Sequence, residues 1–158
     1  MNAATEEEKT NPEIDRSSAR LVAVQALYEI DMTGIDADPV LDEFLRQRWK
    51  SALAMATEGE EDLPEMAAPD GVLLAELVRG VTEKCSELDG IIGPSLSDDW
   101  SVERLEVILR AILRAGTFEL LAMGEVPARV VINEYVNVAK AFFDDNKPAL
   151  VNGVLDKI

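Results

Sequence analysis

The sequence predicts an all-α fold, a compact bundle of about seven helices in one domain. Apolar residues recur at steps of three and four in successive segments, which is the periodicity of one buried helix face. No segment alternates apolar and polar residues as a half-buried strand does, and no glycine-rich phosphate loop is present. The length of 158 residues suits one domain with a substantial core.

The first predicted helix begins at Ser17 or Ser18 as its N-cap, runs to about Met32 and stops at Gly34. A helix that is apolar on two sides is either deeply buried or shared between the core and a partner. This segment has that pattern, with Leu21, Val24, Tyr28 and Met32 on one side and Ala23, Ala26, Leu27 and Ile30 on another.

The next two helices are predicted from their capping residues. Asp38, followed by Pro39 at the first helical position, starts the second helix, which runs to about Met55. Asp70 caps the third helix, whose apolar side extends to Cys85. The stretch ELDGIIGPSLSDDW then predicts a short helix or turn, because two glycines and a proline interrupt it.

The C-terminal part of the chain contains three further predicted helices. Ser101 caps a long segment that reaches about Met123 and, being rich in leucine and isoleucine, is expected to lie at the centre. A sixth helix follows Pro127, and its three-four pattern outweighs the strand preference of its valines. Pro148 lies in the first turn of the last helix, where its missing N–H costs nothing.

Asn152-Gly153 is an unexpected dipeptide inside that last helix, because glycine in a helix costs about 1 kcal/mol relative to alanine. Ala149 lies one turn earlier on the same side, so the two small residues form a shallow groove. Such a groove lets another backbone approach closely. We expect that backbone to belong to the same domain, with an external partner as the alternative.

Two acidic segments are predicted to lie outside the packed core. Residues 1–14 are polar and mostly acidic and are expected to form a disordered tail before the domain at residues 15–158. Residues of about 56–70 read as an acidic loop. Its carboxylates do not have the spacing of an EF-hand, so a solvated loop is favoured over a cation site.

Composition excludes several classes of function. The chain has no histidine and one cysteine, Cys85, so it cannot assemble a Ser-His-Asp or Cys-His nucleophile, a Cys/His zinc site or an internal disulfide. We predict no enzyme activity, no cofactor and no metal site, and we expect Cys85 to be a buried, inert thiol. The chain has no signal peptide and no apolar run of membrane-spanning length, so we expect it in the cytoplasm. Its net charge of -16 disfavours unaided nucleic-acid binding.

Several segments together resemble the NusB family of transcription antitermination factors. The stretches are SSARLVAVQALYEID, LVRGVTEKCSELDGII, ILRAILRAGTFELLAMGEVPARVVINEYVNVAKAF and LVNGVLDKI. The similarity covers Arg16 to Ile158 apart from the acidic loop, and the combination of VPARVVINEYVNVAKAF with VNGVLDK is its most specific part.

The resemblance implies a non-catalytic, all-helical RNA-binding protein. Members of this family bind the boxA element of ribosomal RNA leader transcripts together with NusE, a protein of the small ribosomal subunit. With other Nus factors they act on RNA polymerase so that elongation resists termination. A homodimer is an alternative assembly, because the family includes monomers and dimers.

The resemblance also implies site residues. Arg16 and Arg20 match the arginine-rich start of the first helix, which approaches RNA in the family. Lys140, Phe142 and Lys147 match the end of the sixth helix and the loop after it, also near RNA. Tyr28 matches a position near the ribosomal-protein contact. This chain departs from many relatives by its acidic residues before Arg16 and by Leu150, where they have phenylalanine, so the isolated chain is expected to bind RNA weakly.

Each of these residues also has a purely structural interpretation. Arg16 and Arg20 are one turn apart and would both face a phosphate backbone, or both be solvated. Phe142 either stacks on a splayed base or belongs to the core. Tyr28 is either a core or an interface residue. Asn133, Asn137 and Lys140 share one helix face that is either solvated or turned to RNA.

Arg110 and Arg114 are predicted to form ion pairs on a helix surface, with Glu106 as the partner of Arg110.

Two further interpretations stay open at the level of function. The whole chain could be a helical protein-interaction module in which acidity has displaced RNA binding. It could also be related to the helical accessory domain found beside RNA methyltransferase domains.

Overall fold

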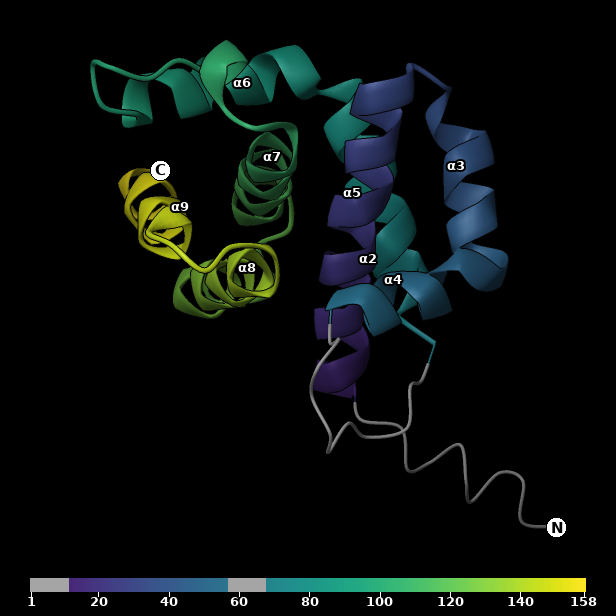
Figure 1. Ribbon diagram of the computed structural model, residues 1–158. Helices are drawn as coiled ribbons and strands as arrows, with labels where there is room; N and C mark the ends of the chain where they lie inside the picture. Colours follow the sequence, from purple (N-terminus) through teal and green to yellow (C-terminus); the bar gives the residue numbers. More distant parts are fainter. Residues whose placement is uncertain (1–11, 57–67) are drawn as a thin grey trace, which may run out of the picture.

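A computed structural model describes residues 12–56 and 68–158 of the chain, and all their regular structure is helical (Figure 1). The α-helices are α2 (Pro12–Thr33), α3 (Ala37–Glu43), α4 (Trp49–Ala56), α5 (Gly71–Glu83), α6 (Cys85–Ser95), α7 (Val107–Ala122), α8 (Ala128–Phe142) and α9 (Lys147–Lys157). A π-helical turn (Phe44–Arg48) joins α3 to α4, and a 3-10 turn (Val102–Arg104) precedes α7. The predicted all-α class is confirmed.

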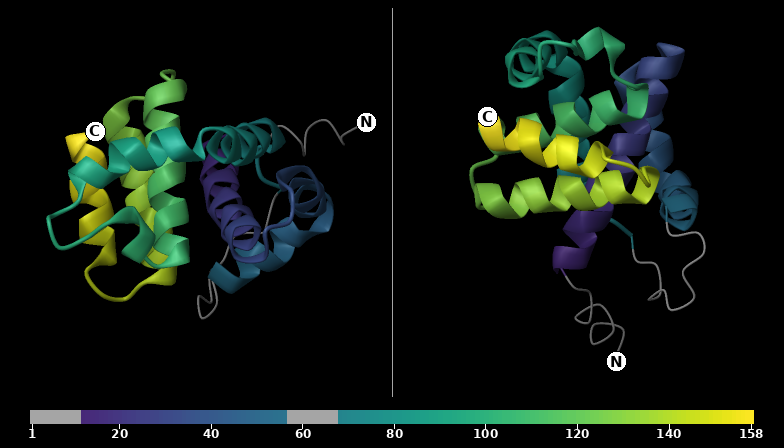
Figure 2. Two further views of the ribbon diagram at one scale, coloured as in Figure 1. Left: turned by 90° about the horizontal axis from the view of Figure 1, so that it is seen from above. Right: turned by 60° about the vertical axis from the view of Figure 1, so that its left-hand side comes forward.

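Helix α2 lies between two groups of helices, as Figures 1 and 2 show. On one side it packs against α3, α4 and α5, and on the other against α7 and α8. The side of α2 that carries Ala23, Ala26 and Leu27 is buried, and so is Val24 on the other side, where Tyr28 and Met32 farther along the helix are exposed. The two-sided apolar pattern of this segment reflects that position between two layers.

Several helix boundaries differ from the predicted ones. Helix α2 begins at Pro12 rather than at Ser17, although it ends as expected before Gly34, whose φ of 73° suits glycine. Asp36 rather than Asp38 is the N-cap of α3, and Asp38 lies in the first turn, where its charge favours the helix dipole. Ser101 begins the 3-10 turn, so the long helix starts only at Val107.

Other boundaries are confirmed. Asp70 caps α5 through its side chain, which accepts hydrogen bonds from the backbone N–H groups of Val72 and Leu73. Helix α8 follows Pro127, and Pro148 lies in the first turn of α9. These boundaries are set by a capping side chain and by prolines at helix starts, and both can be recognised from neighbouring residues in the sequence.

Two glycines let helices approach closely, but Gly153 is not one of them. A Cβ atom at Gly80 would lie 2.1 Å from the Phe118 ring, and one at Gly116 would lie 2.9 Å from the Leu155 side chain. A Cβ atom at Gly153 would meet nothing within 4 Å. The predicted close approach of a backbone from the same domain at Gly153 is therefore wrong, and this face of α9 is open.

The remaining predictions about the chain are only partly covered by the described residues. The predicted tail at residues 1–14 and the acidic loop at about 56–70 fall largely at residues 1–11 and 57–67, outside the described ranges. Cys85 is half-buried rather than fully buried, and burial raises the pKa of its thiol. Within the described ranges, no helix has both the length and the apolarity needed to cross a membrane.

Candidate nucleic-acid interface

Arg20 lies at the centre of a buried polar network between α2, α7 and α8. Its side chain is 3% exposed, and its guanidinium donates to Glu119 from Nη2 to Oε2 at 2.7 Å and from Nε to Oε1 at 2.9 Å. The hydroxyl of Tyr135 donates to the same carboxylate at 2.8 Å. Glu119 and Tyr135 are also buried, so the carboxylate of Glu119 is satisfied by protein donors.

A second carboxylate ties this network to the start of α2. Arg20 Nη1 donates to Glu134 Oε1 at 2.8 Å, and the hydroxyl of Ser17 donates to the same oxygen. Glu134 belongs to α8, so the N-terminal turns of α2 lie alongside α8. Arg20 is thus turned inward, contrary to the expectation that it faces solvent beside Arg16.

The network shifts the pKa values of its members in directions that burial and charge explain. Burial acts to lower the pKa of Arg20, but the hydrogen bonds and charge of Glu119 outweigh it and raise that pKa. Burial, followed by the charge and hydrogen bond of Glu119, raises the pKa of Tyr135 well above its usual value. Arg20 therefore stays charged and Tyr135 stays neutral in the folded protein.

Arg16 is half-buried and makes no ion pair with the described residues. It lines a groove of about 340 Å³ beside the start of α5, together with the carboxylates of Asp70, Glu76 and Glu125. The position suits an anion contact by Arg16 itself, but the groove around it is acidic. Arg20 lines the same groove, but Glu119 and Glu134 hold its guanidinium, so Arg16 and Arg20 do not form a paired phosphate contact in this structure.

Tyr28 and Phe142 lie in one groove of about 590 Å³ between α2, the π-helical turn and the end of α8. Tyr28 is 40% exposed, and Met32 and Met55, which also line the groove, are more exposed still. Tyr28 therefore has the exposure of an interface residue rather than a core residue. Exposed large apolar side chains gathered in one groove are typical of interaction sites.

Phe142 is expected from the sequence either to belong to the core or to stack on an RNA base. It packs against the core and also lines the groove, where its ring could meet a base. Lys147 lies near this groove, with its Nζ 5.8 Å from the centre of the Phe143 ring and 3.0 Å from Asp145 Oδ2. Lys140 is exposed on the outer face of α8. The structure thus places Tyr28 and Phe142 in one groove, with Lys147 beside it, and Arg16 and Arg20 in another.

The rim of the Tyr28 groove carries a charged pair that sequence reasoning missed. Arg48 donates from both Nη atoms to the Glu29 carboxylate at 2.7 Å, and its guanidinium stacks 4.4 Å from the centre of the Phe44 ring. The hydrogen bond from Arg48 lowers the pKa of Glu29. The π-helical turn sets the register of Phe44 and Arg48, and no local sequence signal predicts such a turn.

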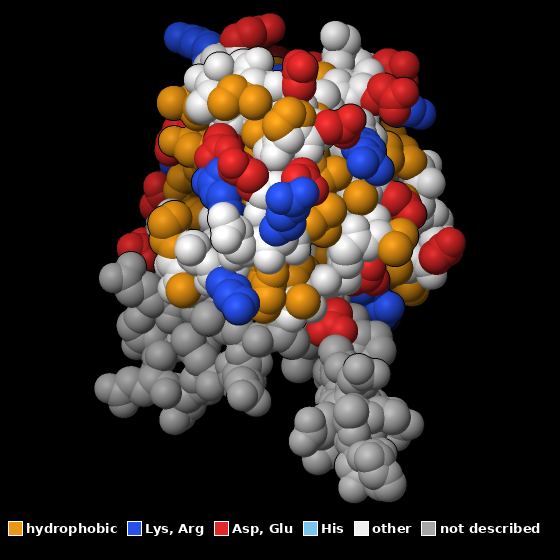
Figure 3. All heavy atoms as spheres, turned by 90° about the vertical axis from the view of Figure 1, so that its right-hand side faces the viewer, with side chains coloured by type: hydrophobic (Ala, Val, Ile, Leu, Met, Phe, Trp, Pro, Cys, Tyr) orange, Lys and Arg blue, Asp and Glu red, His pale blue; other side chains and the backbone are white. Residues whose placement is uncertain are grey.

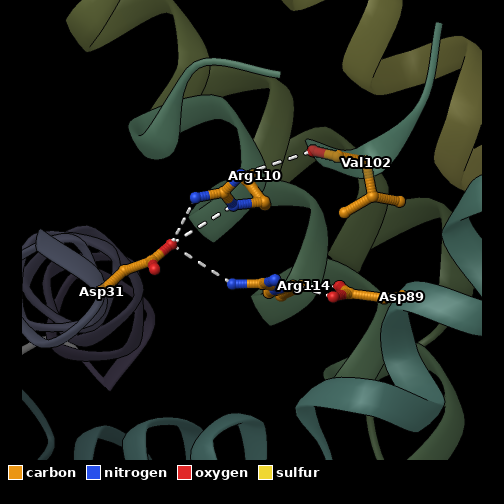
Figure 4. Close-up of polar contacts among 5 residues, drawn as sticks. All are labelled: Asp31, Asp89, Val102, Arg110 and Arg114. Atoms are coloured by element: carbon orange, nitrogen blue, oxygen red, sulfur yellow. Dashed lines mark hydrogen bonds and ion pairs between the residues drawn. The ribbon is translucent and has the colours of Figure 1, made fainter. Parts of the chain in front are cut away.

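Arg110 and Arg114 form ion pairs, as predicted, but with partners on other helices (Figure 4). Both guanidinium groups donate to Asp31 Oδ2 on α2, at 2.9 Å from Arg110 and 3.4 Å from Arg114. Arg114 also donates to both oxygens of Asp89 on α6 at 2.7 Å. Glu106 is not the partner of Arg110; it lies 3.9 Å from Lys147. These arginines therefore join helices rather than form a free cationic site.

Glu119 and Glu134 were also missed as members of the central network. A sequence signal for Glu119 does exist, because it is a single carboxylate within the apolar run TFELL. A buried carboxylate requires a cation or several donors. No cluster of three or more His, Cys, Asp or Glu residues that could hold a metal occurs among the residues at 12–56 and 68–158.

Comparison with known proteins places these features in one family. The NusB family model matches residues 17–158. The transcription antitermination protein NusB of Sinorhizobium fredii is 45% identical over 143 residues, which cover 90% of this chain and 84% of that protein.

Solved structures agree with the sequence comparison. NusB of T. maritima superposes with a TM-score of 0.71 at 29% identity, over 90% of this chain and 88% of that one. A chain from a complex of the antitermination factors NusB and NusE with double-stranded RNA gives a TM-score of 0.67 at 24% identity, over 90% and 94% of the two chains. The family match over most of the sequence and the shared helical fold show that this chain belongs to the NusB family.

Proposed function

We propose that this chain binds boxA-type RNA jointly with the ribosomal protein NusE and thereby supports transcription of ribosomal RNA in the bacterial cytoplasm. As a member of the NusB family it is a transcription antitermination factor and not an enzyme. The related complex of NusB, NusE and RNA supports the choice of partners. Other Nus factors and RNA polymerase complete the proposed assembly.

The observation that carries this proposal is the groove shared by Tyr28 and Phe142. Tyr28 and the two methionines offer exposed apolar area to a protein, while Phe142 offers a ring on which a base can stack. One groove with both kinds of surface supports a protein and an RNA bound side by side. The partner contacts the Tyr28 end, and RNA passes near Phe142 and Lys147.

The charge of the chain requires the partner to assist RNA binding. A net charge of -16 gives no long-range attraction for a polyanion. NusE is expected to be basic, as proteins bound to ribosomal RNA are, so docking it beside Tyr28 extends a positive surface along the RNA path. We therefore expect weak binding of boxA RNA by the isolated chain and binding tighter by about tenfold or more in the complex.

A titration of boxA RNA with the isolated chain and with its NusE complex tests the proposal. Tyr28→Asp is expected to abolish the gain from NusE while leaving the weak binding of the isolated chain unchanged. Ile91→Asp, a similarly exposed apolar position on α6, is the matched control and is expected to retain the gain. Equal affinities of the isolated chain and the complex would refute partner assistance. If neither binds RNA, the chain is a protein-interaction module instead.

A further inference from the structure

The outer face of the α8–α9 pair carries a row of cations and amides. Arg129, Asn133, Asn137 and Lys140 recur at steps of four, four and three along α8, so they share one face, and all four are exposed. Asn152 of α9 faces the same groove, which has a volume of about 610 Å³ and is also lined by Arg129 and Asn133. We call these five residues the α8–α9 face.

The side chains of the two cations of this face, Arg129 and Lys140, make no ion pair or hydrogen bond with any described residue. By contrast, on the side of the molecule that carries α3, cations lie among carboxylates (Figure 3). Arg46 pairs there with Asp42 at 3.2 Å. A chain with a net charge of -16 thus leaves both cations of one helix face unpaired, which favours an anionic ligand there.

The acidic residue of α8 that could neutralise this face is held away from it. Glu134 follows Asn133 directly, but it accepts hydrogen bonds from Arg20 and Ser17 on α2. The groove retains one carboxylate, Asp156, near the C-terminal end of α9. The buried network thereby removes a charge that would repel a polyanion from the row of amides.

The α9 side of the face carries small, exposed residues. Ala149 and Gly153 are exposed, and a Cβ atom at Gly153 would meet nothing within 4 Å. The helix surface therefore offers no bulky side chain beside Asn152 that would block an extended strand. Arg129 and Lys140 are separated by eleven residues of helix, which corresponds to about 16 Å.

We propose that the α8–α9 face binds the sugar–phosphate backbone of single-stranded RNA and extends the RNA path from Lys140 to Arg129. The inference rests on the proposed function, which places RNA near the end of α8. Arg129 and Lys140 neutralise phosphates, while the amides of Asn133, Asn137 and Asn152 donate to phosphate and sugar oxygens. The contacts are made to the backbone, so they add affinity without base specificity.

The test uses the complex of the full chain with NusE and a boxA RNA that carries single-stranded flanks on both sides. Each cation on a single strand contributes about 0.7 to the slope of log affinity against log salt. Arg129→Ala is expected to flatten the slope by about 0.7 and to weaken binding at low salt, and Arg129→Lys is expected to restore the slope. Asn152→Asp should weaken binding by adding a like charge.

Lys84→Ala is the matched control, because Lys84 is another exposed cation whose side chain has no partner among residues 12–56 and 68–158, but it lies at the junction of α5 and α6. It is expected to leave the slope unchanged, and thermal melting of every variant should match that of the original chain. If Lys140→Ala flattens the slope while Arg129→Ala does not, the RNA path ends at Lys140 and this inference fails while the proposed function stands. If Arg129→Ala weakens NusE binding without RNA, the face is a protein contact instead. If the unaltered complex does not bind RNA, both proposals fail.

Discussion

The guanidinium of Arg20 and the carboxylate of Glu119 form a two-pronged contact in the interior, with Nη2 2.7 Å from Oε2 and Nε 2.9 Å from Oε1. Removing one partner of such a pair leaves the other charge buried and uncompensated. Arg20→Ala is therefore expected to lower the free energy of unfolding by about 3–5 kcal/mol. Urea denaturation followed by circular dichroism measures this loss.

The control for this prediction is Arg46→Ala, because Arg46 pairs with Asp42 at an exposed position. Exposed pairs contribute about 0–1 kcal/mol, so this variant should unfold near the midpoint of the original chain. Similar losses for the two variants would mean that the Arg20 network is not the buried ionic contact described above.

Tyr135 should ionise at a higher pH than an ordinary tyrosine. Burial and the Glu119 carboxylate raise the pKa of Tyr135 in the folded state, so its neutral form contributes stability. That contribution is complete below the pKa of the unfolded chain, about 10, and is lost as pH rises through the folded pKa. Tyrosinate absorbance during an alkaline titration should show a late step that is absent in Tyr135→Phe. Its persistence in that variant would contradict the assignment.

Asp70 and Asp38 are both predicted as helix caps, but only Asp70 makes capping hydrogen bonds, so the two should contribute differently to the free energy of unfolding. Asp70 accepts from two backbone N–H groups at the start of α5, whereas Asp38 caps no helix. Asp70→Ala should lower the free energy of unfolding by about 0.5–2 kcal/mol. Asp38→Ala should cost less, because it loses an exposed ion pair with Arg79 and a charge near the helix dipole. Thermal melting of both variants would reveal a reversed order.

Gly80 and Gly153 should respond in opposite directions to a larger side chain. Gly80→Ala places a methyl group into the Phe118 ring and is expected to cost about 1–3 kcal/mol. Gly153→Leu meets open space and gains helix propensity, so it should melt at or above the temperature of the original chain. A destabilised Gly153→Leu would show that this face is occupied within the folded protein.

The helical architecture was predictable because its signals are local. Apolar spacing located the helices, and Asp70, Pro127 and Pro148 marked the starts of α5, α8 and α9. Helix α2 began earlier than predicted because Ser17 uses its hydroxyl for Glu134 on α8 rather than as a cap. Local capping rules do not contain that partner, which lies 117 residues away along the chain.

The candidate site was less predictable than the fold for a related reason. Arg16 and Arg20 are one turn apart and equivalent by pattern, yet Arg20 is buried and Arg16 is not. The difference arises because Arg20 pairs with Glu119, which lies 99 residues farther along the chain and so is not indicated by any local pattern. The π-helical turn that places Arg48 beside Glu29 has no periodic signature either. Site geometry depends on tertiary partners, while helix positions depend largely on neighbours in sequence.

The position of α2 between the two groups of helices also sets the order in which the chain can mature during synthesis. Arg20 leaves the ribosome 99 residues ahead of Glu119, its partner in the interior. Until α7 and α8 emerge, one side of α2 has nothing to pack against, and the guanidinium of Arg20 remains in water. Contacts of such long sequence separation form late. The nascent chain therefore completes its core, and pairs Arg20 with Glu119 on α7 and Glu134 on α8, only near the end of translation.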